Sequence, residues 1–530
     1  MRIGLFFSTG AGLIQQSMDL DKLAGVYAAD FFIAIYDDFF KTSNLKHMLE
    51  DIRINQLEAV LLIGESPLFY QTQRAADSLL HKIEALGINP NKIGYVNLKE
   101  QLVMVHIGRE DALREKAKLL IDVEIERVRK AEFLDIIPVA PRKSVVIIGA
   151  TLAAFFTAQQ MLQKGYATYI INSEPISWKQ LSIPEETLGP LLAYMEDHVK
   201  FNLLEKAEIN DIYGYAGDYT LKLEIAGAEI TVAAGAIVVA NSESLEFTNK
   251  IRPLLHIDID EDGYFKPLNR DTLSVYSSEQ GIYLVENQEN DLRRTVTAAA
   301  STAMAVIELL DCDEINHKIA VSEIDTELCG GCGICVKTCL FHACKIDPVE
   351  NYAVIDTKRC KGCGNCVTSC PTGARDLLTY PQKYLFNAIS ILSRFKAESE
   401  KILMFLCEGC GYRAMDNAAL MGLKYPIGVM PLKVRCGGTI DTQLILEAFH
   451  DGFDGVIICK CQDGHCSNIV GNVDLDRRAN LFREILRSRG IDAERLHIVD
   501  ALHSGDNRCV QVIEELYLEI SKPGGEHCEK

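Results

Sequence analysis

One cysteine spacing occurs twice in this sequence and constrains its fold more than any other feature. The first copy follows C-x2-C-x2-C-x3-C, and the second repeats it and ends in a proline, Pro371. In this spacing, three cysteines on a tight loop bind one face of a four-iron cube, and the fourth binds the other cube. Zinc ribbons use pairs of cysteines around one tetrahedral ion instead. The repeat therefore predicts two [4Fe-4S] clusters.

The spacing also assigns the ligands. The predicted ligands of the first cluster are Cys329, Cys332, Cys335 and Cys370. Those of the second cluster are Cys339, Cys360, Cys363 and Cys366. The motif resembles bacterial-type 2[4Fe-4S] ferredoxins, although Leu340 replaces the proline usual after the first quartet. Cys344 lies outside both quartets, and we expect it to pack against a cluster.

Composition narrows the class of protein further. The chain has eighteen cysteines, none before Cys312, a net charge of −20 and a pI near 5.1. Clumped cysteines favour metal sites over disulfides, and the negative charge disfavours nucleic acid or an anionic membrane surface as partner. We see no secretory signal and no apolar run long enough to span a bilayer. We therefore expect a cytoplasmic protein without direct membrane insertion.

Alternating strand and helix patterns predict a multidomain α/β chain. Strand patterns such as RIGLFF and AVLLIG fall in an N-terminal α/β domain over 1–140, and a strand–turn–helix opens a Rossmann-like domain over 141–312. The dense cysteines occupy a ferredoxin domain over 315–380. A further α/β unit covers 395–510, and a tail that begins as helix covers 511–530.

A second group of cysteines lies in the 395–510 unit. Each member falls just after a predicted strand, and such strand ends meet at one edge of an α/β sheet. The group comprises Cys407, Cys410, Cys436, Cys459, Cys461 and Cys466. We expect several of these sulfurs to meet at one metal centre. A redox dithiol at Cys407 and Cys410, or zinc, is the alternative.

This C-terminal region resembles the delta subunit of methyl-viologen-reducing hydrogenase. The matching residues are Phe405, Cys407, Cys410, Cys436, Asp441, Cys461, Cys466, Gly471, Asn472, Arg477 and Arg478. The resemblance implies a [2Fe-2S] cluster held by four of Cys407, Cys410, Cys436, Cys461 and Cys466, and leaves open which one is spare. Cys459 is then a neighbour, and His465 a structural or supporting residue.

Residues 1–380 resemble a shortened form of the A subunit of heterodisulfide reductase. The matching stretches are 97–101 with Val105 and His106, 144–164, 260–266 and the ferredoxin insert. In that family the N-terminal region carries cluster cysteines and the second unit binds FAD. This chain has no cysteine before Cys312, so it lacks the ligands for an N-terminal cluster.

The flavin contacts of that family are also degraded. The phosphate-binding fingerprint reads Gly149, Thr151 and Ala154, so a branched side chain stands where the backbone should approach the pyrophosphate. Asn172 stands at the ribose acid, and Glu286 with Asn287 replaces a Gly-Asp pair. The later A-T-G turn reads Ala240-Asn241-Ser242. We predict a degenerate Rossmann-like domain without FAD.

Together the resemblances imply a fusion of the two subunits. The expected role is an electron-transfer subunit of an anaerobic oxidoreductase complex, relaying single electrons between partner subunits, one of which could be an active FAD-bearing homologue. No residue resembles a catalyst of substrate-bond chemistry. The alternatives are an FAD-containing electron-bifurcating subunit with an atypical pocket, and a redox sensor.

Overall fold

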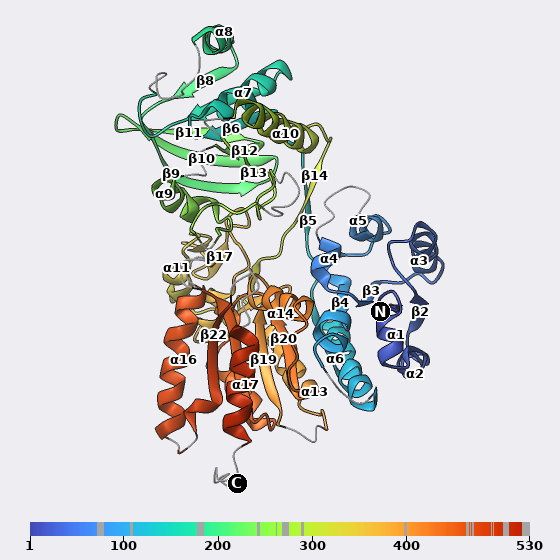
Figure 1. The fold of residues 1–530 in the computed structure, drawn as a ribbon. Helices are drawn as coiled ribbons and strands as arrows, with labels where there is room; N and C mark the ends of the chain where they lie inside the picture. Colours follow the sequence, from blue (N-terminus) through green and yellow to red (C-terminus); the bar gives the residue numbers. More distant parts are fainter. Residues whose placement is uncertain are drawn as a thin grey trace. The chain divides into compact units, whose positions relative to one another are not determined.

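The fold comes from a computed structural model, shown in Figure 1. The structure describes residues 1–71, 79–106, 110–176, 185–240, 244–260, 262–267, 275–287, 291–396, 400–462, 466, 468, 471–488, 490, 492–501 and 508–521. Two compact units make up the chain. The first contains residues 1–135, 320–356 and 360–530, and the second contains residues 136–319 and 357–359.

The N-terminal part of the first unit is a four-stranded parallel sheet in the order β2-β1-β3-β4. Its strands are β1 Ile3–Ser8, β2 Phe32–Tyr36, β3 Ala59–Gly64 and β4 Ile93–Asn97. All residues of β1 and β3 are buried, because helices pack on both faces. One face is covered by α1 Leu13–Ser17, α2 Leu20–Gly25 and α6 Glu110–Lys130, and the other by α3 Thr42–Ile54 and α5 Leu79–Glu84. Short turns are α4 Pro67–Gln71, η1 Pro90–Lys92 and η2 Lys99–Val103.

The cysteine repeat folds as two matching halves. Each half has a loop, a short helix and a strand that pairs antiparallel with another. The helices are α11 Ile334–Thr338 and α12 Asn365–Thr368. The strands are β15 Ser322–Ile324 paired with β18 Arg375–Leu377, and β16 Cys344–Ile346 paired with β17 Ala353–Ile355.

The C-terminal part of the first unit is a second parallel sheet, in the order β20-β19-β21-β22. Its strands are β19 Ile402–Cys407, β20 Val429–Val434, β21 Gly455–Cys461 and β22 Leu496–Ala501. One face packs against α13 Gln382–Leu392, α15 Thr442–His450 and α16 Gly471–Ser488, and the other against α14 Gly411–Leu420 and α17 Arg508–Ile520. Short 3-10 turns are η4 Gly437–Thr439 and η5 Ala493–Arg495. Apolar residues on alternate positions of β19, such as Phe405 and Leu406, fill the two cores.

The second unit is built on a five-stranded parallel sheet in the order β13-β12-β6-β7-β8. Its strands are β6 Ser144–Ile148, β7 Ala167–Ile171, β8 Phe201–Leu204, β12 Ala236–Val239 and β13 Ile282–Leu284. One face packs against α7 Leu152–Gln163, α8 Glu185–Glu196 and α10 Leu292–Leu310. The other face packs against α9 Leu245–Leu255 and an antiparallel sheet of β9 Ala207–Tyr215, β10 Asp218–Ile225 and β11 Ala228–Ala234. A two-stranded ribbon pairs β5 Ile136–Val139 with β14 Ile315–Lys318.

The observed elements form the mixed α/β architecture predicted from sequence, with strand–turn–helix at 144–163 as expected. No helix in the described ranges combines the length and apolar character that a bilayer crossing requires.

Candidate iron–sulfur sites and the degenerate flavin site

The first cysteine quartet lies partly at the surface. Cys335 on α11 is buried, whereas Cys332 is exposed. The backbone N–H of Ala353 donates to Cys329 Sγ at 3.4 Å, and the Arg375 guanidinium donates to Cys335 Sγ at 3.3 Å. Burial alone would raise the pKa of Cys370, but hydrogen bonds from Thr372 and nearby backbone amides lower it. Donors already aimed at sulfur suit thiolate ligands.

The second quartet lines a common cavity. Cys339, Cys360, Cys363 and Cys366 all border it, and Cys344 borders it too. The Cys344 thiol hydrogen-bonds with Cys339 and Cys366, which lowers the pKa of each to about 6 and raises that of Cys344. The four predicted ligands therefore surround one space, and Cys344 is a buried thiol beside it.

Two glycines at matching places shape the cluster loops. Gly331 has φ +67° and Gly362 has φ +62°, a left-handed conformation that glycine adopts without strain. A Cβ would lie 2.3 Å from the Asn351 carbonyl oxygen at Gly331, and 2.3 Å from the Ala320 carbonyl oxygen at Gly362. Only glycine fits either turn, so the loop geometry is built into the sequence.

The C-terminal cysteines gather at the carboxyl ends of three adjacent strands. Cys407 ends β19, Cys461 ends β21, and Cys436 follows β20 by two residues. Cys410 immediately precedes α14. The predicted convergence of strand ends therefore brings these side chains to one edge of the sheet.

Hydrogen bonds connect all five thiols of the predicted [2Fe-2S] set. Cys461 interacts with Cys407, Cys410 and Cys466, and its sulfur lies 3.8 Å from that of Cys407. Cys436 interacts with Cys466, whose pKa is lowered to about 3 by Cys436 and Cys461. Five buried sulfurs at this spacing form a donor set that fits an iron–sulfur cluster.

Cys459 and His465 were both expected beside this group of thiols. Cys459 is buried and hydrogen-bonds with Cys509 of α17. Cys509 was not predicted from sequence, because a single cysteine about fifty residues downstream carries no spacing signal. His465 lies outside the described residues.

The loop of the second quartet meets the C-terminal thiols directly. Thr368 Oγ1 donates to the Gly438 carbonyl at 3.0 Å, and Arg478 donates to the same oxygen at 3.1 Å. A Cβ at Gly438 would lie 1.9 Å from Asn365 Oδ1 and 3.4 Å from the Cys363 carbonyl oxygen. Cys363 is also close enough to Cys436 to interact with it electrostatically. The two groups of sulfur ligands therefore lie on either side of one packed contact.

The residues at the flavin position do not fit a bound diphosphate. Thr151 Oγ1 accepts the N–H of Ala154 at 3.3 Å, and Asn287 Oδ1 accepts the N–H of Ala153 at 3.2 Å. Free N–H groups at this helix start are what a dinucleotide phosphate requires. The Asn172 side chain donates to the Glu174 carbonyl at 2.8 Å. Glu286 is exposed, and Asn241 and Ser242 lie outside the described residues.

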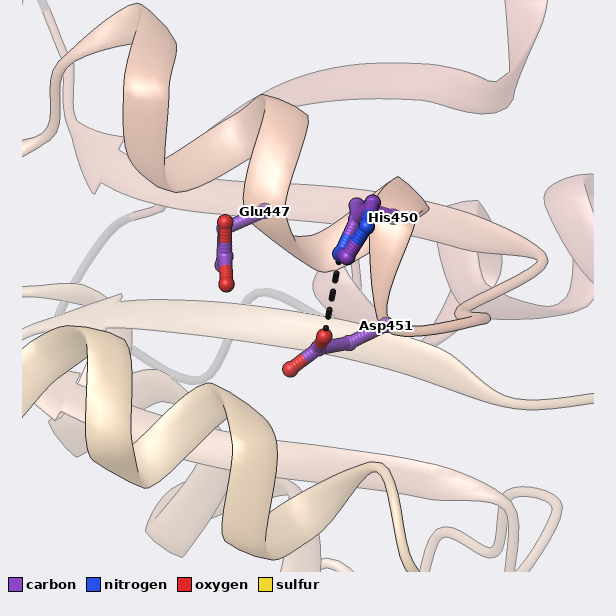
Figure 2. A group of neighbouring side chains, drawn as sticks. All are labelled: Glu447, His450 and Asp451. Atoms are coloured by element: carbon purple, nitrogen blue, oxygen red, sulfur yellow. Dashed lines mark hydrogen bonds and ion pairs between the residues drawn. The ribbon is translucent and has the colours of Figure 1, made fainter.

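One other group of potential ligands stands apart from the cysteines. Glu447, His450 and Asp451 have ligand atoms within 4.8 Å of one another at the end of α15, and Figure 2 shows the His450 ring facing Asp451. His450 Nδ1 lies 3.3 Å from Asp451 Oδ1, but the His450 side chain is 80% exposed. A histidine so exposed is not held in a coordinating orientation, and we assign no ion to this group.

The fold and these thiol groups define an iron–sulfur protein. The family model "Methyl-viologen-reducing hydrogenase, delta subunit" matches residues 402–524, and two "4Fe-4S dicluster domain" models match residues 328–374 and 352–413. The chain belongs to the hydrogenase delta-subunit family through this C-terminal region. The iron–sulfur D subunit of the F420-non-reducing hydrogenase of Archaeoglobus profundus is 32% identical over 23% of this chain and 90% of its own length. The vhc D subunit of Methanococcus voltae is 36% identical over 18% and 67%.

The resemblance to heterodisulfide reductase is confirmed as well. The A subunit of the ferredoxin:CoB-CoM heterodisulfide reductase of Methanosarcina mazei is 29% identical over 50% of this chain and 33% of its own length. The chain thus spans about a third of the heterodisulfide reductase relatives it matches. Together, the two sets of relatives and the four-iron models fit a fusion of this A subunit with a delta subunit.

Proposed function

We propose that this chain is an iron–sulfur electron-transfer subunit of a multi-subunit oxidoreductase. Two four-iron sites and a C-terminal two-iron site pass single electrons between partner proteins. The names of its relatives support the proposal, since they are subunits of heterodisulfide reductases and hydrogenases. The partners we expect are subunits of heterodisulfide reductase, hydrogenase or dehydrogenase type in an anaerobic, cytoplasmic complex, including an FAD-bearing homologue.

The contact between Asn365 and Gly438 carries this proposal. It joins the loop of Cys363 to the turn after Cys436, so the second four-iron site and the C-terminal site share a wall one residue thick. The second quartet is in turn joined to the first, because Cys339 and Cys370 each belong to the opposite repeat. Three sites in sequence suit a relay better than an isolated sensor.

The ligand sets follow from the spacing and the gathered thiols. We assign Cys329, Cys332, Cys335 and Cys370 to one [4Fe-4S] cluster. Cys339, Cys360, Cys363 and Cys366 hold the other. Four of the five connected C-terminal thiols hold a [2Fe-2S] cluster. These side chains hold and electrostatically tune the clusters, and the clusters supply the one-electron chemistry.

We further propose that the second unit binds no FAD and acts as a scaffold. The helix start that would hold the flavin diphosphate is capped by Thr151 and Asn287. A phosphate there would have to displace two internal hydrogen bonds and a threonine side chain. The unit offers no cysteine for dithiol chemistry before Cys312.

Anaerobic purification of the full chain tests the proposal. We expect about ten irons per chain, from two four-iron sites and one two-iron site, with matching acid-labile sulfide. Reduced protein should show the paramagnetic signals of both cluster types. Protein without iron would overturn the electron-transfer role, whereas stoichiometric flavin released on denaturation would favour the FAD-containing bifurcating alternative.

A further inference from the structure

Cys344 and Arg375 occupy equivalent places in the two cysteine repeats. Each lies five residues after the fourth cysteine of its motif, and each begins a strand, β16 or β18. The first repeat therefore has a thiol where the second has a guanidinium. Arg375 does not stand out in the sequence, because a lone arginine after a cysteine motif matches no ligand pattern.

The Arg375 guanidinium lies between ligands of both four-iron sites. The residue is only 3% exposed, and one nitrogen, Nη2, donates to Cys335 Sγ at 3.3 Å. Its charge also interacts with Cys344 and with Cys366 of the other quartet. The second nitrogen, Nη1, is buried and finds no hydrogen-bond partner among the residues that the structure describes.

A buried cation needs a counter-charge. Arginine remains protonated in proteins, and burying its charge is costly unless negative charge lies close to it. The groups that hold the pKa of Arg375 up are the thiols of Cys335, Cys344 and Cys366, and no carboxylate is among them. Four thiolates outweigh the positive charge of an oxidised four-iron core, so a cluster on either side would supply the missing charge. The unpartnered Nη1 points to the same conclusion, since cluster sulfur accepts such bonds.

We propose that Arg375 is the shared internal counter-charge of the two four-iron sites and raises their reduction potentials, most strongly at the site that contains Cys335. The inference rests on the proposed function, because it requires both clusters. Reduction adds negative charge to a cluster, and a fixed nearby cation stabilises the reduced form. The site bonded to Arg375 gains more than the site beside the uncharged Cys344 thiol, so the pair is electrically unequal.

Potentiometric titration of the full-length holoprotein, followed by electron paramagnetic resonance, tests this role. In Arg375→Met, the ratio of reduced to oxidised cluster at a fixed potential should fall about tenfold at one four-iron site, equal to about 59 mV for a one-electron couple. Arg375→Lys keeps the charge and should recover at least half of that shift. Lys345→Gln removes an exposed charge beside Cys344 and should change little, because solvent screens it.

Iron and sulfide analysis separates the possible outcomes. If Arg375→Met keeps its clusters and both four-iron potentials match the wild type, the inference is wrong. If the variant fails to bind iron, wild-type protein labelled with ¹⁵N in the arginine guanidinium groups decides instead. Pulsed resonance on the reduced clusters should detect coupling to that nitrogen, and its absence would overturn the inference. Wild-type protein that lacks four-iron clusters would contradict the proposed function itself.

Discussion

Two cysteines of β21 show how much a single residue position decides. Cys459 and Cys461 lie two apart on the strand, so their side chains leave the same face. Cys461 meets Cys407, Cys410 and Cys466, whereas Cys459 meets Cys509 on α17. Neighbouring thiols of one strand therefore have different surroundings.

Serine substitution should distinguish the two positions. Cys461→Ser removes the thiol that joins three others, and we expect loss of the two-iron signal with about two irons fewer per chain. Cys459→Ser is the matched control and should keep both the signal and the iron. Iron analysis and electron paramagnetic resonance on anaerobic protein give the answer. Equal losses in both variants would show that Cys459 is also a ligand.

The sequence could predict the gathered thiols but not every neighbour. Cys407, Cys436 and Cys461 were predictable as a group, because strand ends of a parallel sheet meet at one edge. The Cys459–Cys509 contact was not predictable, since it depends on how α17 packs on the sheet. The place of Arg375 was missed for a similar reason, because only the folded repeat brings it to Cys335.

At the scale of elements, α14 links the thiol site to the N-terminal sheet. The helix starts after Cys410, and its Asp416 accepts hydrogen bonds from Ser66, Asn97 and Gln101 near the carboxyl ends of β3 and β4. Burial raises the pKa of Asp416 to about 6. Sequence patterns could not predict this polar contact, because apolar periodicity marks cores and says nothing of buried polar networks.

Glu100 in this contact should make stability depend on pH. Burial raises its pKa from 4.5 to about 7; Lys99 opposes that rise, and Asp416 adds to it. Because the folded pKa exceeds the unfolded one, the folded state binds more protons between about pH 4.5 and 7. Stability should therefore fall as pH rises through that window, by about 3 kcal/mol at most. Glu100→Gln should reduce the drop in thermal midpoint between pH 5.5 and 7.5, whereas the exposed Glu50→Gln should not.

The contact between the ferredoxin loop and the C-terminal site can be tested with a single methyl group. In Gly438→Ala, the new Cβ would overlap Asn365, and we expect a loss of ~1–3 kcal/mol in stability with slower electron transfer between the two sites. Gly25→Ala is the control, because nothing lies within 4 Å of its added Cβ. Rapid-mixing absorbance after reduction measures the rate. A normal rate in Gly438→Ala with a full complement of iron would count against this contact as the electron path.

For the whole molecule, the cysteine sites all lie in the first unit. Removing iron with a chelator should therefore destabilise that unit alone, because cluster binding contributes to its folding free energy. Calorimetry of holo and apo protein should show one thermal transition moving to lower temperature and another unchanged. A second transition that moves equally would mean that the two units unfold together.

The paired strands β5 and β14 have a consequence for how this chain can be cut. Val139 lies opposite Ile315 and Ile136 opposite Lys318, so the polypeptide arrives at the second unit and departs from it along one two-stranded ribbon. Residues facing each other across such a ribbon have Cα atoms about 5 Å apart. A tight turn could replace everything between them, which makes the flavoprotein-like portion a removable cassette and the electron-carrying remainder a candidate miniature protein.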